Sequence, residues 1–301
     1  MTESRTEHPL KIFLASLACY ALFAVMNVFV KLVSQTQPVL EIMFFRNALA
    51  LIPTIVVIMN SGGLNLLKTE NPGGHFLRSL VGTVSMVFFF ISFARLPLAN
   101  ATAIQATSPL LQTLLSIWLL RETVGPHRMC AVMVGLCAVL FMLHPSGGGH
   151  FVDSLMALMA AILSAFVMII IRRIGRTENP TTIVFYFMLF GALSSALFLP
   201  FVWVTPAPLT LLYLLMVGLT GGSAQLFMTW AYANAPTAFV STFSYVSIVF
   251  AAIADWLIWQ HVIDWHIALG SAIVVMSGMY VLYREALHHR APMPEGITLN
   301  D

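Results

Sequence analysis

Long apolar runs, separated by short polar or turn-forming segments, recur along the whole chain. Ten of these runs have about the twenty residues that an α-helix needs to cross a hydrocarbon core of ~30 Å. Segments rich in glycine and proline, such as 62–63, 71–74 and 206–208, separate them. The predicted spans are 11–33, 39–60, 76–95, 98–120, 127–143, 151–172, 180–203, 208–233, 237–259 and 265–283. The pattern predicts an all-α integral membrane protein with ten transmembrane helices.

Composition points to the same class of protein. Of the 301 residues, 59% are hydrophobic and only 9% are charged, whereas soluble domains carry about 25% charged residues. The net charge of +2 is small and dispersed, which argues against a nucleic-acid partner. The three cysteines fall inside apolar runs, so we expect them to be packing residues and predict no disulfide framework, metal site or cofactor.

Basic residues are divided unequally between the two sides of the predicted bundle. If the N-terminus is inside, the outer segments hold only Lys31 and Arg95. The inner segments hold Arg5, Lys11, Lys68, Arg78, Arg121, Arg128, Arg172, Arg173, Arg176, Arg284 and Arg290. The positive-inside rule therefore predicts that both termini are cytoplasmic. Residues 286–301 follow the last apolar run and are predicted to form a disordered cytoplasmic tail.

The two halves of the chain resemble each other. Residues 94–99 (ARLPLA) match 233–238 (ANAPTA), and residues 22–31 (LFAVMNVFVK) match 163–172 (LSAFVMIIIR), at offsets of 139 and 141. Each half, 11–143 and 151–285, therefore holds five helices, and an odd number forces the two copies into opposite orientations. Inverted repeats are typical of secondary transporters, whose substrate site lies near the midplane between the repeats.

The run 98–120 carries a polar face interrupted by a proline. Thr102, Gln105, Ser108 and Gln112 recur at spacings of three and four residues, so they share one side of a helix. Pro109 has no N–H to donate and clashes with the carbonyl of Gln105, which frees a backbone acceptor at mid-membrane. Such a break is tolerated where it is packed in protein or lines a wet cavity, so Pro109 is a candidate hinge.

Other predicted helices carry small, polar or aromatic residues at matching depths. The candidate substrate-binding residues are Asn27, Ser85, Phe89, Gln105, Ser108, Met168, Gln225, Thr229, Trp230, Ser244 and Tyr245. Gly82 and Gly221, which correspond at the offset of 139, are further candidate hinges. For any single residue, hydrogen bonding between helices is an equally good explanation. For the whole set, a cavity is favoured.

Few charges lie inside the spans. Arg46 lies about 10 Å below the outer edge at 1.5 Å per residue, where we expect it to meet a partner on another helix or face a vestibule, with substrate binding and snorkelling as alternatives. Glu41 and Asp255 lie near outer ends and could pair with Lys31, Arg95 or Arg46 as a gate or a structural clamp. No carboxylate lies at mid-depth, which argues against a proton-coupled exporter of cationic drugs. A neutral cavity with one cationic neighbour suits a neutral or zwitterionic solute.

Several of these features resemble the EamA-type drug/metabolite transporters over roughly residues 11–285. The matching features are ten helices in inverted halves, the FFRN run at 44–47, the Ala-x-x-Pro-x-Ala turn at 94–99 and the LLRE ending at 119–122. Within that family the chain looks like the bacterial amino-acid exporters of the YddG type. The resemblance implies a basket-like fold whose central cavity is lined by helices 1, 3, 4, 6, 8 and 9, set in the bacterial inner membrane.

Two positions carry over from the family and two depart from it. Arg46 matches the arginine often found in the second helix, and Glu122 matches the acidic residue at the inner end of the fourth. In the second half, Gln260 replaces the acidic residue and Met188 stands opposite Arg46 at an offset of 142. The charge therefore belongs to one half only, which argues against two equivalent gates.

The leading hypothesis is a secondary exporter of small metabolites, foremost amino acids and among them aromatic or bulky neutral ones, that works by alternating access. Because a duplicated chain supplies both halves of the pathway, a monomer is expected. The alternatives are a carrier of other metabolites or drug-like solutes and a membrane-embedded enzyme. An enzyme would need paired aspartates, two inner carboxylates or a Ser/His arrangement, and the sequence shows none of these constellations.

Overall fold

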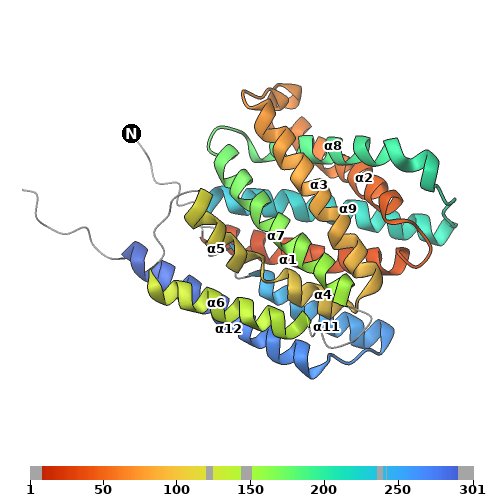
Figure 1. Ribbon diagram of the computed structural model, residues 1–301. Coiled ribbons are helices and arrows are strands. Elements are labelled where there is room, and N and C mark those ends of the chain that lie inside the picture. Colours follow the sequence, from red (N-terminus) through yellow and green to blue (C-terminus); the bar gives the residue numbers. More distant parts are fainter. Residues whose placement is uncertain (1–8, 120–124, 144–150, 236–239, 242, 291–301) are drawn as a thin grey trace, which may run out of the picture.

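The computed structural model describes residues 9–119, 125–143, 151–235, 240–241 and 243–290, and within these ranges the chain is helical without a strand. Helices suit a bilayer because every backbone N–H and C=O is bonded within the segment. The first half contains α1 (Pro9–Val33), α2 (Val39–Ser61), the 3₁₀-helix η1 (Gly63–Leu67), α3 (Pro72–Arg95), α4 (Leu98–Gln105), α5 (Ser108–Leu119) and α6 (Pro126–Leu143). The second contains α7 (Phe151–Ile174), α8 (Pro180–Val202), α9 (Pro208–Asn234), the 3₁₀-helix η2 (Phe243–Tyr245), α11 (Val246–Trp259) and α12 (Trp265–Arg290), as Figure 1 shows.

Six of these helices, α1, α2, α3, α7, α8 and α9, are each long and apolar enough to cross a membrane. Shorter apolar stretches occupy α6, the segment formed by η2 and α11, and α12. With α4 and α5 counted as one broken segment, the described residues form ten helical segments in the order that the apolar runs predict.

The packing of the helices relates the two halves by an approximate twofold exchange. α1 packs along α9, and the corresponding helix of the second half, α7, packs along α3. The pairs α2 and α8, α4 and α11, and α6 and α12 each join two corresponding helices (Figure 1). The predicted fold class, an all-α membrane protein with two inverted five-helix halves, is confirmed.

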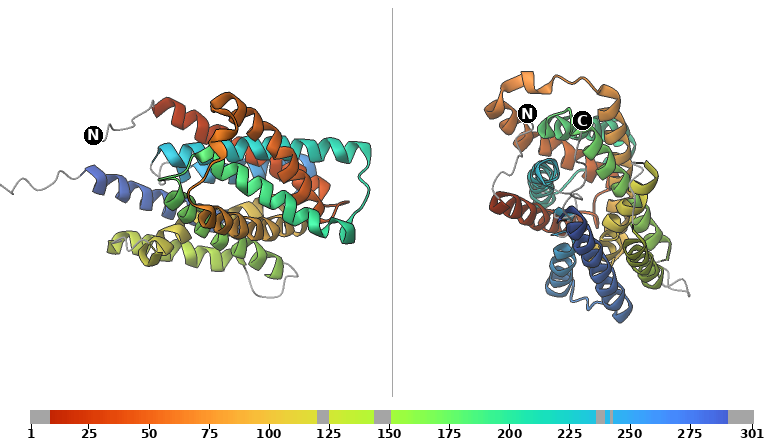
Figure 2. Two further views of the ribbon diagram at one scale, coloured as in Figure 1. Left: turned by 90° about the horizontal axis from the view of Figure 1, so that it is seen from above. Right: turned by 90° about the vertical axis from the view of Figure 1, so that its left-hand side faces the viewer.

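Both ends of the described chain leave the bundle on the same side, as Figure 2 shows for the start of α1 and the end of α12. We call this side the terminal end and the opposite side the far end. Because successive helices cross in alternate directions, the loop between α2 and α3 and the loop between α7 and α8 lie at the terminal end. The α1–α2 and α3–α4 connections lie at the far end.

The predicted break at Pro109 is present. α4 ends at Gln105 and α5 begins at Ser108, and a tight turn joins them in which Thr107 N–H donates to the Ile104 carbonyl at 3.1 Å. The break lies in the middle of the segment 98–119, so an irregular backbone reaches mid-membrane as expected from the missing donor of proline. Whether the break acts as a hinge stays a prediction.

Two predicted boundaries were wrong. α3 begins at Pro72 and not at residue 76, because the Asn71 side chain caps it by accepting from Gly74 N–H at 2.9 Å and proline is favoured at the first helical position. α12 continues to Arg290, so the predicted tail 286–301 is helical over its first five residues. Alanine and leucine at 286 and 287 are strong helix formers that extend the helix past its apolar part. Residues 291–301 lie outside the described part of the chain.

Candidate functional site

A cavity of about 210 Å³ lies in the middle of the bundle and is bordered by both halves. It is smaller than the roughly 300–1,000 Å³ of drug-sized pockets, so in this conformation it suits a small solute. Its wall is formed by Tyr20, Phe23, Met26, Asn27, Arg46, Arg78, Gly82, Ser85, Met86, Phe89, Phe90, Thr102, Gln105, Ala106, Ser108, Pro109, Gln112, Ser164, Val167, Met168, Phe187, Gln225, Met228, Tyr232, Ser244 and Ser247. None of these described residues is a carboxylate.

The structure brings eight of the eleven predicted substrate-binding residues to this wall. They are Asn27, Ser85, Phe89, Gln105, Ser108, Met168, Gln225 and Ser244. Two of the predicted hinge residues, Gly82 and Pro109, and the predicted charge Arg46 also line it. Sharing a wall shows proximity, and their contact with a substrate stays a prediction.

The other three predicted binding residues lie outside the wall. Thr229 is buried behind it, with its hydroxyl 3.4 Å from the Gln225 amide nitrogen. Trp230, one residue further along α9, is rotated by about 100° and lines a separate pocket at the terminal end together with Ser61 and Arg176. The hydroxyl of Tyr245 fills the space that a side chain on Gly278 of α12 would need.

A hydrogen-bonded group joins α3, α4 and α7 at the cavity. The Ser85 and Ser164 hydroxyls lie 3.0 Å apart, and the Gln105 amide donates to Ser164 at 2.8 Å. Two amide oxygens at the wall, Asn27 Oδ1 and Gln105 Oε1, are buried and have no hydrogen-bond partner among the described residues. These oxygens are available as acceptors for a donor on a bound molecule.

Arg78 was predicted to be one of the basic residues of the inner segments, but the structure buries it in α3 at the cavity wall. Because α3 begins at Pro72, Arg78 lies about 9 Å inside the helix, and it is only 2% exposed. Its guanidinium lies 3.6 Å from the centroid of the Phe187 ring of α8. The cap sequence Asn71-Pro72 was the signal that would have placed it correctly. The cavity therefore has two cationic residues and not one.

Arg46 also faces the cavity, but it has no acidic partner among the described residues. Its Nη1 donates to Asn47 Oδ1 at 2.9 Å and lies 3.1 Å from the sulfur of Met188, the residue that corresponds to it in the other half. The expected partner on another helix is thus Met188, with the Phe187 ring at 5.5 Å. A thioether and an aromatic ring do not neutralise a guanidinium.

Gly82 and Gly221 lie within continuous helices, and each makes room for one of the arginines. A side chain on Gly82 would collide with Arg78 Nη1, and a Cβ on Gly221 would lie 2.6 Å from Met26 Sδ and 3.2 Å from Arg46 Nε. The two corresponding positions therefore share a spatial role. Their role as hinges stays a prediction.

The predicted pairing of the remaining charges is resolved at the far end. Lys31 Nζ lies 3.1 Å from Asp255 Oδ1 and donates to the Leu96 carbonyl, while Ala99 N–H donates to Asp255 Oδ2 at 2.6 Å. This far-end cluster joins α1 and α4 of the first half to α11 of the second. Glu41 instead accepts from Val204 N–H at 3.0 Å. Neither carboxylate pairs with Arg46.

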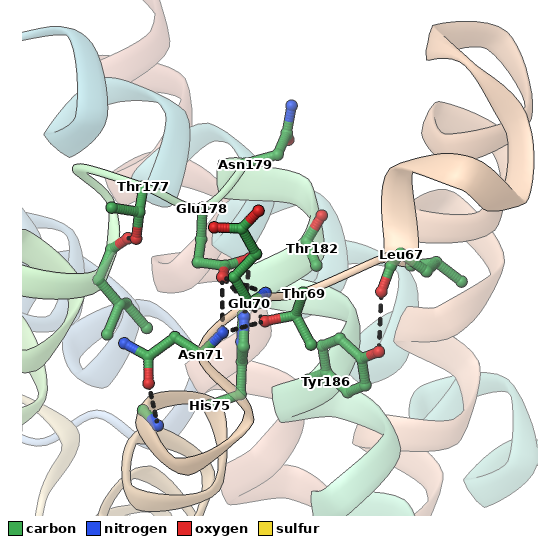
Figure 3. Close-up of polar contacts among 12 residues, drawn as sticks. Leu67, Thr69, Glu70, Asn71, His75, Thr177, Glu178, Asn179, Thr182 and Tyr186 are labelled. Carbon is green, nitrogen blue, oxygen red and sulfur yellow. Dashed lines mark hydrogen bonds and ion pairs between the residues drawn. The ribbon is translucent and has the colours of Figure 1, made fainter.

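Glu178 organises a second cluster at the terminal end (Figure 3). Its Oε1 accepts from the Thr69 hydroxyl at 2.9 Å and from the N–H groups of Glu70 and Asn71 at 3.1 Å, and its Oε2 lies 3.3 Å from His75 Nε2. Burial by itself would raise the pKa of Glu178, but the hydrogen bonds from Thr69, His75 and Glu70 outweigh it and hold the pKa below its ordinary value. The Glu178 cluster joins the α2–α3 loop of one half to the α7–α8 loop of the other. Glu122 and residues 236–239 lie outside the described residues.

Replacing Glu178 with Gln is expected to lower the free energy of unfolding by about 1–2 kcal/mol at pH 7, because hydrogen bonds to a charged acceptor are lost. A depressed carboxyl pKa stabilises the fold above its ordinary value and loses that effect as the pH falls through the folded value. The difference between the two proteins should therefore shrink below about pH 4.3. Melting temperatures in detergent at pH 7 and at about pH 3 measure it. The exposed neighbour Glu70→Gln is the control, and an equal loss there would contradict the assignment.

The chain is similar in sequence to known membrane transporters. The profile of the EamA-like transporter family matches residues 10–144 and again 153–284. The pseudopaline exporter CntI of Pseudomonas aeruginosa is 30% identical over 271 residues, covering 88% of this chain and 93% of the exporter. A riboflavin transporter of Vibrio cholerae is 26% identical (94% and 96% covered), and an S-adenosylmethionine uptake transporter of Rickettsia prowazekii is 25% identical (91% and 92% covered).

A solved structure supports the fold independently. A protein crystal structure aligns with a TM-score of 0.70 over 94% of this chain and all of that chain, at 19% identity, which bears on the fold alone. The related sequences export or take up small metabolites. The family profile matches each inverted half and together covers most of the chain, so this chain belongs to the EamA-like transporter family.

Proposed function

We propose that this protein exports amino acids, or metabolites built like them, by alternating access. The observation that carries the proposal is the cavity wall, which presents guanidinium donors and amide oxygens that no described residue hydrogen-bonds, all in one small space. Guanidinium groups bind carboxylates, and amide oxygens accept from ammonium groups. An amino acid carries both of these groups, and the volume of the cavity suits a molecule of that size.

Export across the bacterial inner membrane is the proposed direction and place. The exporter from Pseudomonas aeruginosa that resembles this chain supports the direction. Exposed basic residues at the terminal end support an orientation with both chain ends in the cytoplasm, by the positive-inside rule. These residues are Lys68, Arg172, Arg173 and Arg176.

Alternating access requires the two halves to separate at one end at a time. In this structure each end carries a cluster that joins the halves, Lys31 with Asp255 at the far end and His75 with Glu178 at the terminal end. We propose that each cluster breaks when its end opens. The inverted relation of the halves makes the two openings similar movements.

Counterflow in liposomes tests the proposal. Purified protein is reconstituted into liposomes loaded with one unlabelled L-amino acid, and uptake of trace labelled amino acid is followed for a panel of acidic, neutral and aromatic ones. Uptake above protein-free liposomes is expected for at least one class. Monodisperse, folded protein that exchanges none of them would overturn the proposal.

A further inference from the structure

We propose that Arg46 and Arg78 together form one subsite for a substrate that carries two carboxylate groups, namely an amino acid or a related acid. This inference rests on the proposed function and names its substrate class. It replaces the sequence-based expectation of a neutral or zwitterionic solute. That expectation assumed a single cation near the cavity, whereas the structure places two at its wall.

The cavity wall carries two buried positive charges. Arg46 and Arg78 are 3% and 2% exposed, and an arginine side chain stays protonated in proteins. Neither forms an ion pair with a described carboxylate, and no described residue at the wall is acidic. By contrast, Lys31, which is buried in the same bundle, is paired with Asp255. A buried charge is strongly destabilising unless it is paired, so the cavity favours a ligand that brings the missing negative charge.

Several guanidinium N–H donors at the wall have no acceptor among the described residues. Arg46 Nε and both Nε and Nη1 of Arg78 are buried and have no acceptor among the described residues. Arg46 Nη1 reaches only the Asn47 amide oxygen and the Met188 sulfur, and sulfur is a weak acceptor. Carboxylate oxygens match the planar donor geometry of guanidinium groups better than any neutral acceptor.

The two guanidinium groups lie near the same aromatic ring, so both can contact one ligand. Both Cζ atoms lie within 5.5 Å of the centroid of the Phe187 ring, one at 3.6 Å. The ring holds two like charges near each other by its π-face, and Gly82 and Gly221 leave the space that the two side chains occupy. A ligand with one negative charge would leave one of these cations uncompensated. Two carboxylates on one molecule compensate both.

Amide oxygens at the same wall suit the ammonium group of such a ligand. Asn27 Oδ1 and Gln105 Oε1 lie at the same wall without a hydrogen-bond partner in the described part of the chain, and they provide acceptors for an ammonium group. A molecule with two carboxylates and one ammonium group, such as L-glutamate or L-aspartate, would satisfy both sets of groups. Its neutral amide analogue would leave part of the guanidinium donors unsatisfied.

Thermal stabilisation of the purified wild-type protein by matched pairs of ligands provides the main test. L-glutamate is compared with L-glutamine, and L-aspartate with L-asparagine, each titrated to give an apparent Kd from the shift in melting temperature. At least a tenfold tighter binding of the acid in one pair is expected, since a charge-assisted contact is lost in the amide. Equal affinities for acid and amide in both pairs would overturn the subsite.

Variants then assign the preference to the arginines. Arg78→Gln and Arg46→Gln are each expected to reduce the acid-over-amide preference at least tenfold, because one guanidinium group then remains for two carboxylates. Arg173→Gln, an exposed arginine at the end of α7, is the matched control and should keep the preference. If the preference survives in both cavity variants, the assignment is wrong. If a variant does not fold, the wild-type comparison of acid and amide still decides.

The outcomes separate this inference from the proposed function. Counterflow of neutral amino acids at rates equal to acidic ones leaves the proposed function intact and overturns the subsite. Stabilisation by O-phospho-L-serine or succinate without flux of any amino acid supports an anion subsite for two charges and overturns the proposed amino-acid export.

Discussion

Replacing Asp255 with Asn lowers the free energy of unfolding by about 3–5 kcal/mol, the range measured when one partner of a buried ion pair is removed. Asp255 is 1% exposed and lies 3.1 Å from Lys31 Nζ, so the variant leaves a buried lysine without its counter-charge. The asparagine oxygen can still accept from Ala99 N–H, which limits the change to the ion pair. The midpoint of thermal unfolding in detergent measures the effect.

Two controls separate the ion pair from other causes. At the same end, the exposed Arg95 pairs with the half-buried Asp153 at 3.2 Å, and Arg95→Gln should cost no more than about 1 kcal/mol. The double variant Lys31→Met with Asp255→Asn removes both charges and should recover most of the loss. If the double variant melts as low as Asp255→Asn alone, the buried pair is not the source of the stability.

Replacing Gly222 with Ala is the second change with a large expected effect, a loss of about 1–3 kcal/mol from overpacking. A Cβ at Gly222 would lie 2.8 Å from both Cα and Cβ of Ala50 and 3.0 Å from its carbonyl oxygen. These are atoms of a packed helix and not the end of a flexible side chain. α9 would therefore have to move away from α2, which borders the cavity through Arg46.

Gly73→Ala is the matched control, since no atom lies within 4 Å of its added Cβ and the residue is exposed in the first turn of α3. Alanine is favoured over glycine in a helix, so this variant should melt at or slightly above the wild type. A Gly222→Ala protein that melts no lower than Gly73→Ala would show that α2 and α9 are not held at the distance described.

The sequence predicted the features of the site that depend on local chemistry. The break before Pro109 follows from one missing N–H, and most of the polar face of 98–120 indeed reaches the cavity. The prediction from sequence failed where the rotation of a residue about its helix axis decides whether its side chain reaches the cavity. Trp230 follows Gln225 by five residues on α9 but lies outside the wall, because five steps of about 100° turn its side chain to another face of the helix.

The position of Arg78 shows how a boundary error changes an electrostatic conclusion. A helix start placed at residue 76 put Arg78 in the first turn at the inner end of its helix, and the cavity was therefore expected to have one cationic neighbour. With the start at Pro72, a second guanidinium is buried beside Phe187. Helix boundaries depend on caps of one or two residues, whereas the apolar runs extend over twenty, so the runs are the more robust signal.

The sequence by itself determined the class of this protein, its ten helices and its inverted duplication. The lengths of the apolar runs and the internal similarity are properties of the chain. In a bilayer, a helix satisfies every backbone N–H and C=O group within its own segment, so such runs form helices. Only the tertiary structure decided which charges meet: it pairs Lys31 with Asp255 and leaves Arg46 and Arg78 at the cavity without a carboxylate from the described segments. The physical reason is that Coulomb interactions fall off over a few ångströms of distance, and those distances are set by the tilt and rotation of helices far apart in sequence.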